Sequence, residues 1–184
     1  MLTPRLVAPV IAAVIALAAA YAYSIAGQPG DRLLVQALHG SSAPVRAAAT
    51  LGLRRFKRCP DSDFVPSTAI GLLVAAWDDN VPPRRVRRLL GQLRTLGCDM
   101  NERGAQGLAP LHSAILLNNA GAVRLLLQAG ADPAVRTRLR RTDGGDGDYD
   151  APAFAARLAA TGEENFDAVL AALSRSETPR PGAR

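Results

Sequence analysis

The chain has 184 residues, enough for one domain with an appendage. Apolar residues make up 48% of it and aromatic residues only 4%, so a core must be built from Ala, Leu and Val. This composition favours packed helices over a β-sandwich, whose strands are enriched in β-branched and aromatic side chains. The formal charge is +6, but every basic residue except Lys57 is an arginine, which we interpret mainly as composition bias.

Residues that could carry chemistry are scarce. The sequence has two histidines and two cysteines, His39, His112, Cys59 and Cys98. Their spacing fits no zinc-finger pattern. Asp146, Asp148 and Asp150 alternate as in a calcium loop, but the glycine and glutamate that such a loop requires are absent, so we interpret them as a flexible acidic loop. No nucleophile motif or phosphate-binding glycine pattern is present. We therefore expect no catalytic residue, no metal and no cofactor.

An uncharged apolar run covers residues 6–26. At 1.5 Å per residue, a helix of this length spans roughly the 30 Å of a bilayer core. A signal peptide also has a basic start, an apolar run and small-residue cleavage sites, here ending at Ala22 or Ala26. Its apolar region usually covers only about 7–15 residues, so we favour an uncleaved, single-pass anchor in a bacterial-type inner membrane. The following domain is then periplasmic. A cleaved, periplasmic form is the alternative.

The most informative segment follows at 107–132. It contains the run Pro110-Leu111-His112-Ser113-Ala114, then the apolar positions Val123, Leu126 and Leu127, and then Gly130-Ala131-Asp132. This segment resembles an ankyrin repeat, a pattern of about 33 residues centred on T-P-L-H-x-A. The resemblance implies two helices joined by a turn. It further implies that His112 bonds to backbone of a neighbouring repeat, that Asn118 takes the left-handed turn position and that Gly130 ends the second helix.

One repeat cannot bury its own faces, so neighbours are expected. Gly97 precedes Gly130 by one repeat length, and Ser67 is a candidate cap for a helix over 67–77. The second helix of that repeat has an apolar stripe, Val86, Leu89, Leu90 and Leu93. Upstream, Gly40 and Gly52 have the spacing of Asn118 and Gly130, and after the best repeat the pattern restarts at 151–154.

These features predict an all-α fold: one transmembrane helix followed by a short ankyrin-type solenoid of about four repeats. The predicted boundaries are a tail over 1–5, the membrane segment over 6–26, a linker over 27–30, the repeat domain over 31–173 and a disordered tail over 174–184. Residues 134–150 form an inserted loop within the repeat domain.

Two sets of residues are candidates for partner binding. Leu116 and Leu117 occupy positions that the ankyrin pattern exposes before the turn, where they would form an apolar patch. Alternatively, the 78–83 connection or the 134–150 loop covers them. The second set comprises two basic clusters that could form one edge: Arg54, Arg55, Lys57 and Arg58, and then Arg136, Arg138, Arg140 and Arg141. Charge runs of this kind are more often simply solvated.

The two cysteines predict one disulfide. An exported domain with only Cys59 and Cys98 is expected to hold a single bridge. Both follow second helices of consecutive repeats, and a bridge would enclose 38 residues. In a cytoplasmic domain both thiols would stay reduced.

The predicted function is that of a membrane-tethered, non-catalytic module. The ankyrin resemblance implies that it binds another protein, here at the extracytoplasmic face. We expect no nucleic acid partner and a monomer apart from the protein partner. The alternative is a cytoplasm-facing array whose arginine-rich edge binds anionic lipid or nucleic acid.

Overall fold

The computed structural model describes residues 16–60, 68–77, 80–139, 148–162 and 164–175. Within these ranges every regular element is a helix, which confirms the predicted all-α class. A helix runs to residue 26. The helices after it are α2 (Gly30–His39), α3 (Ala43–Leu53), α4 (Ala69–Ala75), α5 (Pro83–Thr95), α6 (Pro110–Leu116), α7 (Ala120–Ala129), α8 (Ala151–Ala160) and α9 (Asp167–Ser174).

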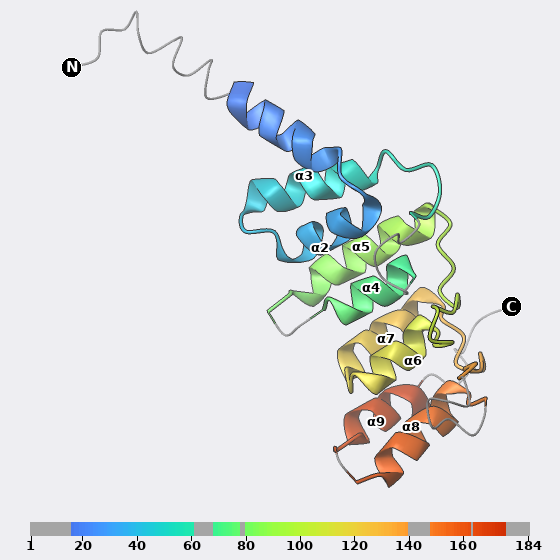
Figure 1. Ribbon diagram of the computed structural model, residues 1–184. Coiled ribbons are helices and arrows are strands. Elements are labelled where there is room, and N and C mark those ends of the chain that lie inside the picture. Colours follow the sequence, from blue (N-terminus) through green and yellow to red (C-terminus); the bar gives the residue numbers. More distant parts are fainter. Residues whose placement is uncertain (1–15, 61–67, 78–79, 140–147, 163, 176–184) are drawn as a thin grey trace, which may run out of the picture.

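These helices form four consecutive pairs that stack one upon another (Figure 1). The first helices of the pairs, α2, α4, α6 and α8, pack in sequence, and we call them the first-helix row. The second helices, α3, α5, α7 and α9, form the second-helix row, in which α7 contacts both α5 and α9. A stack in which each pair contacts only its neighbours is the architecture of a solenoid.

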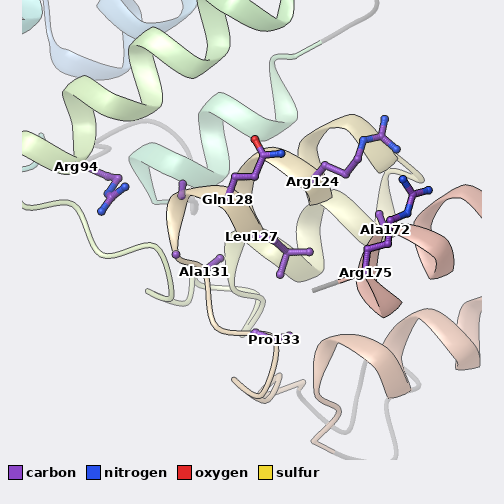
Figure 2. Close-up of a pocket in the computed structure, with 10 residues that line it drawn as sticks. Arg94, Arg124, Leu127, Gln128, Ala131, Pro133, Ala172 and Arg175 are labelled. Atoms are coloured by element: carbon purple, nitrogen blue, oxygen red, sulfur yellow. The ribbon is translucent and has the colours of Figure 1, made fainter. Parts of the chain in front are cut away.

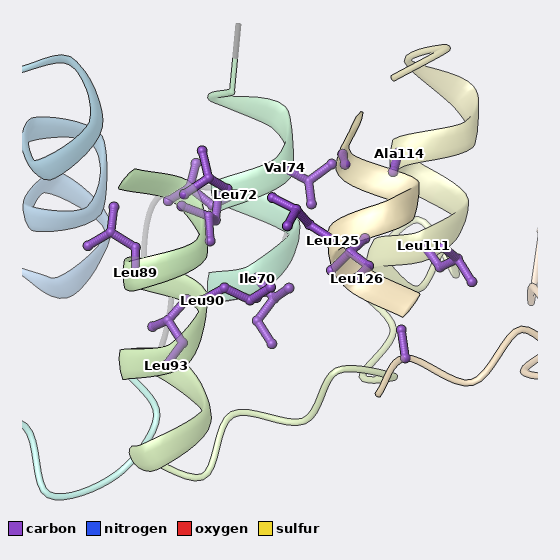
Figure 3. Packing of buried hydrophobic residues seen from close by; sticks show 14 of the residues in the cluster. Ile70, Leu72, Val74, Leu89, Leu90, Leu93, Leu111, Ala114, Leu125 and Leu126 are labelled. Carbon is purple, nitrogen blue, oxygen red and sulfur yellow. The ribbon is translucent and has the colours of Figure 1, made fainter. Parts of the chain in front are cut away.

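The core lies between the two rows and consists almost entirely of aliphatic side chains. Ile70 of α4 and Leu93 of α5 have no exposed surface. Figure 3 shows the labelled side chains of α4 between the leucines of α5 and those of α7. All four residues of the predicted α5 stripe are buried, so the periodicity located this face correctly.

The helix starts are capped unevenly. The side-chain oxygens of Thr68, Asn119 and Asp150 accept hydrogen bonds from backbone N–H groups of α4, α7 and α8, at 3.1, 2.9 and 2.9 Å respectively. Ser67, the expected cap, lies outside the described residues. Thr68 provides the hydroxyl one position later, and α4 covers Ala69–Ala75 rather than the predicted 67–77. The residue before α6 is Ala109, which makes no side-chain cap.

Two turn residues have the predicted conformation. Asn118 has φ of +50°, and Gly130 ends α7 with φ of +96°. The proposed equivalents in the first pair are wrong. Gly40 has φ of −47°, and Gly52 lies inside α3 rather than after it. The reason for glycine at position 52 is space, because a Cβ atom there would lie 2.9 Å from the Cα of Ala26.

The expected membrane segment over 6–26 is described only from residue 16 onward. Among the described residues, no helix combines the length and the apolar character needed to cross a bilayer. Residues 6–15, the loop tip at 140–147 with Arg140 and Arg141, and the tail from 176 lie outside the described residues.

Candidate functional site

The first candidate surface lies at the end of α6. Leu116 is 50% exposed and Leu117 is 53% exposed, although the residues just before them in α6 are buried. The alternative in which a connection covers these two leucines stays a prediction, because residues 78–79 and 140–147 of those connections lie outside the described residues. Large apolar side chains with this much exposure form a patch suited to a partner.

The turn beside this patch is tied to the next helix pair. Asn118 donates from Nδ2 to Oε2 of Glu164 at 3.1 Å and to the backbone oxygen of Asn165 at 3.0 Å. The left-handed backbone at Asn118 aims its side chain across the gap between the pairs. These bonds hold the end of α6 in place, so Leu116 and Leu117 are presented on a fixed turn.

Other apolar groups are exposed along the same row. Val35 of α2 is 40% exposed and lines a groove of about 360 Å³ together with Leu72 of α4. The helix α4 contains no charged residue, and the only titratable residue of α6 is the buried His112. The first-helix row therefore exposes apolar side chains in at least two of its pairs, although the groove at the first pair is also lined by Gln28, Asp31, Arg32 and Gln36.

His112 joins the third pair to the fourth. Its Nε2–H donates to the backbone oxygen of Tyr149 at 3.2 Å, and its ring meets the edge of Phe154 at a centroid distance of 5.5 Å. Burial lowers the pKa of His112, an effect that the backbone bond to Tyr149 opposes. The Nδ1 atom is buried without a hydrogen-bond partner. His112 is thus a neutral structural residue that performs the role expected of it.

The base of the 134–150 loop is built around Thr137 and Tyr149. The N–H of Thr137 donates to the oxygen of Tyr149 at 2.8 Å, and the N–H of Tyr149 donates to Oγ1 of Thr137 at 2.9 Å. Asp150 serves as the α8 cap rather than as part of a calcium loop. No group of three potential metal ligands occurs among the described residues.

The two basic clusters occupy connections of the first and third pairs. The side chain of Arg55 donates to the backbone oxygens of Ala26 and Gln28, so it fastens the helix that ends at residue 26. The backbone of Arg136 accepts a bond from Arg103 at 2.6 Å. The connection 96–109 of the second pair lies between the two clusters along the chain and carries Arg103, and the single basic edge stays a prediction.

A disulfide joins Cys59 to Cys98, with the two Cα atoms 4.8 Å apart. The cysteines lie in the connections that follow α3 and α5. The bridge therefore fastens the first two members of the second-helix row to each other. A hydrogen bond of 3.2 Å from Gln92 of α5 to the backbone oxygen of Thr50 of α3 links the same two helices.

The ankyrin repeat family model matches residues 106–138, which contain α6 and α7. This segment is similar to an ankyrin repeat. No curated protein matches the chain.

Within the ankyrin repeat, most motif residues do what the pattern requires. Pro110 is the first residue of α6, where its missing N–H costs no hydrogen bond. Asn101 shows how the preceding pair meets the repeat, since its Oδ1 accepts from the N–H of Asp132 at 2.9 Å. The departure is Ala109, which replaces threonine and leaves the start of α6 without a hydroxyl cap.

A second surface, which was not predicted from the sequence, lies on the second-helix row. A groove over α7 brings together Arg94, Arg124 and Arg175 from three successive pairs (Figure 2). Their separation in the sequence hides the cluster. One signal for this cluster was available in the sequence, namely the helical period of α5. This period turns Arg94 away from the buried stripe and toward the neighbouring pair.

Proposed function

We propose that the chain is a membrane-tethered, non-catalytic module that binds a partner protein at the extracytoplasmic face. The observation that carries this proposal is the exposure of Leu116 and Leu117 at the end of the first helix of the ankyrin repeat. Ankyrin repeats are in general binding modules, and an exposed apolar patch on a fixed turn is the kind of surface that a protein partner covers.

Contacts at the end of the helix over 16–26 support an uncleaved anchor. Ile25 is only 3% exposed and belongs to the core of the first pair. Arg55 bonds the backbone oxygen of Ala26, and Gly52 leaves room for this residue. Cleavage after Ala26 would remove both groups from the first pair. The segment before residue 27 is therefore proposed to remain attached and to hold the domain near the membrane.

The disulfide supports the extracytoplasmic location. Disulfides persist in oxidising compartments such as the bacterial periplasm and are rare where thiols are kept reduced. With Cys59 and Cys98 bridged, the described chain has no free cysteine. A tether in the same membrane as the partner would raise the effective concentration of the module.

Two experiments test the proposal. A reporter enzyme that is active only outside the cytoplasm is fused after Arg184, and activity is the expected result. Co-purification of the full chain from detergent-solubilised membranes then identifies the partner. A reporter active only in the cytoplasm would contradict the proposal. It would favour the alternative, in which the exposed Arg54, Lys57 and Arg58 contact anionic lipid or nucleic acid.

A further inference from the structure

The groove on the second-helix row is large enough for a ligand. Its volume is about 740 Å³, within the range of roughly 300–1,000 Å³ that is usual for ligand clefts. Figure 2 shows Arg94 on one side of it and Arg124 and Arg175 on the other, with Leu127 between them. Ala131 adds a further apolar contact to the lining. The groove thus combines an apolar floor with cationic walls.

The charge of this groove belongs to a wider pattern. The helices α3, α5 and α7 together contain seven arginines and neither Asp nor Glu. The described residues that line the groove include no acidic residue either. Each guanidinium carries a permanent positive charge and five N–H donors without an acceptor, so this surface complements an anion.

We propose that this groove binds an acidic peptide segment of a partner protein. Carboxylates of the segment pair with Arg94 and Arg124, and an apolar side chain of the segment covers Leu127. Arginine suits this task because its planar fork can hold a carboxylate through two parallel hydrogen bonds. The groove lies on the opposite row from Leu116 and Leu117, so this inference goes beyond the function proposed above and does not depend on it.

Two features favour a peptide over other polyanions. Single-stranded nucleic acids bind where bases stack on aromatic side chains, and no aromatic residue occurs among the described residues that line this groove. A bilayer is the second possible polyanion. The helix over 16–26 leaves the stack at the first pair, at the opposite end from α9 (Figure 1). A membrane approaching from that end meets α2 and α3 before it reaches α7.

The test measures binding of fluorescein-labelled hexaglutamate to the full chain in detergent by fluorescence anisotropy, at about 0.15 M salt. Hexaglutamine is the neutral control peptide. The double variant Arg94→Gln/Arg124→Gln removes two charges from the groove. The matched variant Arg84→Gln/Arg88→Gln removes two charges from α5 outside it. All four arginines lie on helix surfaces, and thermal melts verify that both variants remain folded.

The expected result is that hexaglutamate binds and hexaglutamine does not. The groove variant should weaken binding at least tenfold, about 1.4 kcal/mol, whereas the matched variant should change it less than twofold. No binding of hexaglutamate, or equal losses in the two variants, would overturn the proposal. Tighter binding of vesicles with anionic lipid, or of single-stranded DNA, through Arg94 and Arg124 would overturn it in favour of that other polyanion.

Discussion

The first-helix and second-helix rows contain the same number of helices, but the side chains that they expose to solvent differ. On the first row, Val35, Leu116 and Leu117 are exposed, and α4 has no charged residue. On the second row, α3, α5 and α7 carry seven arginines and no acidic residue. Both rows bury aliphatic side chains toward each other, so the core does not account for the difference. The difference lies in the outer surfaces, for which we propose different partners: an apolar protein patch on the first row and an acidic segment on the second.

The rows also differ in how their first two members are held together. Helices of the first row pack directly on one another, with α4 against α2 and α6. In the second row the disulfide between Cys59 and Cys98 fastens the connections after α3 and α5. Like charges on neighbouring helices repel, so a covalent link at this place offsets a weakness of the arginine-rich row. Substitutions confined to one row at a time test this difference between the rows.

The largest effect is expected from removing the bridge. The double variant Cys59→Ser/Cys98→Ser should lose roughly 3–4 kcal/mol of unfolding free energy, because the bridge closes a loop of 38 residues in the unfolded chain. Chemical denaturation of the full chain in detergent measures this loss. Reductant should destabilise the parent protein to the same degree and leave the variant unchanged. If reductant left the unfolding free energy of the parent protein unchanged, the bridge would not stabilise the second row.

The next effect concerns two glycines of the second row. Gly130 has φ of +96°, and Gly91 lies inside α5 with open space around its Cα. Gly130→Ala should cost about 1–3 kcal/mol, because a side chain in the left-handed region is strained. Gly91→Ala should instead stabilise α5 by roughly 0.5–1 kcal/mol. Thermal melts of the two variants should therefore shift in opposite directions, and shifts of equal sign would contradict the placement of Gly130 at a helix end.

On the first row, His112 should make stability depend on pH. Burial lowers the pKa of His112 in the folded chain, so the unfolded chain binds the proton more readily. Stability should fall as pH decreases below about 6.5, by at most about 1.4 kcal/mol per pH unit. Urea denaturation at several pH values measures the slope. The variant His112→Gln should show a shallower slope, and an equal slope would assign the effect to other groups.

A further small stability effect is expected at the start of α6. Ala109→Thr should supply the missing hydroxyl cap and stabilise the protein by about 1 kcal/mol. The reverse change at the equivalent start of α4, Thr68→Ala, should lose a similar amount, because Thr68 accepts a bond from the N–H of Gly71. Melting temperatures that move in the same direction would show that the two helix starts are not equivalent.

The sequence predicted most where local rules decide the structure. Pro110, Asn118 and Gly130 each have a conformation set by their own backbone, and the α5 stripe follows from helical periodicity. The same rules failed at Gly52. This glycine looked like a helix end, but its small size serves contact with Ala26, a residue in the preceding helix that no local pattern identifies.

For the candidate surfaces too, local patterns predicted some features of the structure and missed those that depend on how the pairs stack. The ankyrin pattern located Leu116 and Leu117, because it specifies which positions precede the turn. It also predicted that both side chains are exposed, as they are, but it could not indicate how the connections of other pairs run. The groove lined by Arg94, Arg124 and Arg175 arises only when three pairs stack, so neither charge counting nor spacing revealed it. The basic edge that the charge runs suggested includes Arg140 and Arg141, which lie outside the described residues, so it stays a prediction.

The most direct test of the proposed function compares exposed leucines on the two rows. Leu51 of α3 is 59% exposed, similar to Leu116 and Leu117, but it lies on the second row. The full chain, the variant Leu116→Ser/Leu117→Ser and the variant Leu51→Ser are each purified from detergent-solubilised membranes, with thermal melts as the folding control. We expect all three to melt alike, and only the Leu116/Leu117 variant to lose the co-purifying protein. Retention of the partner by that folded variant would contradict binding through the first-helix row.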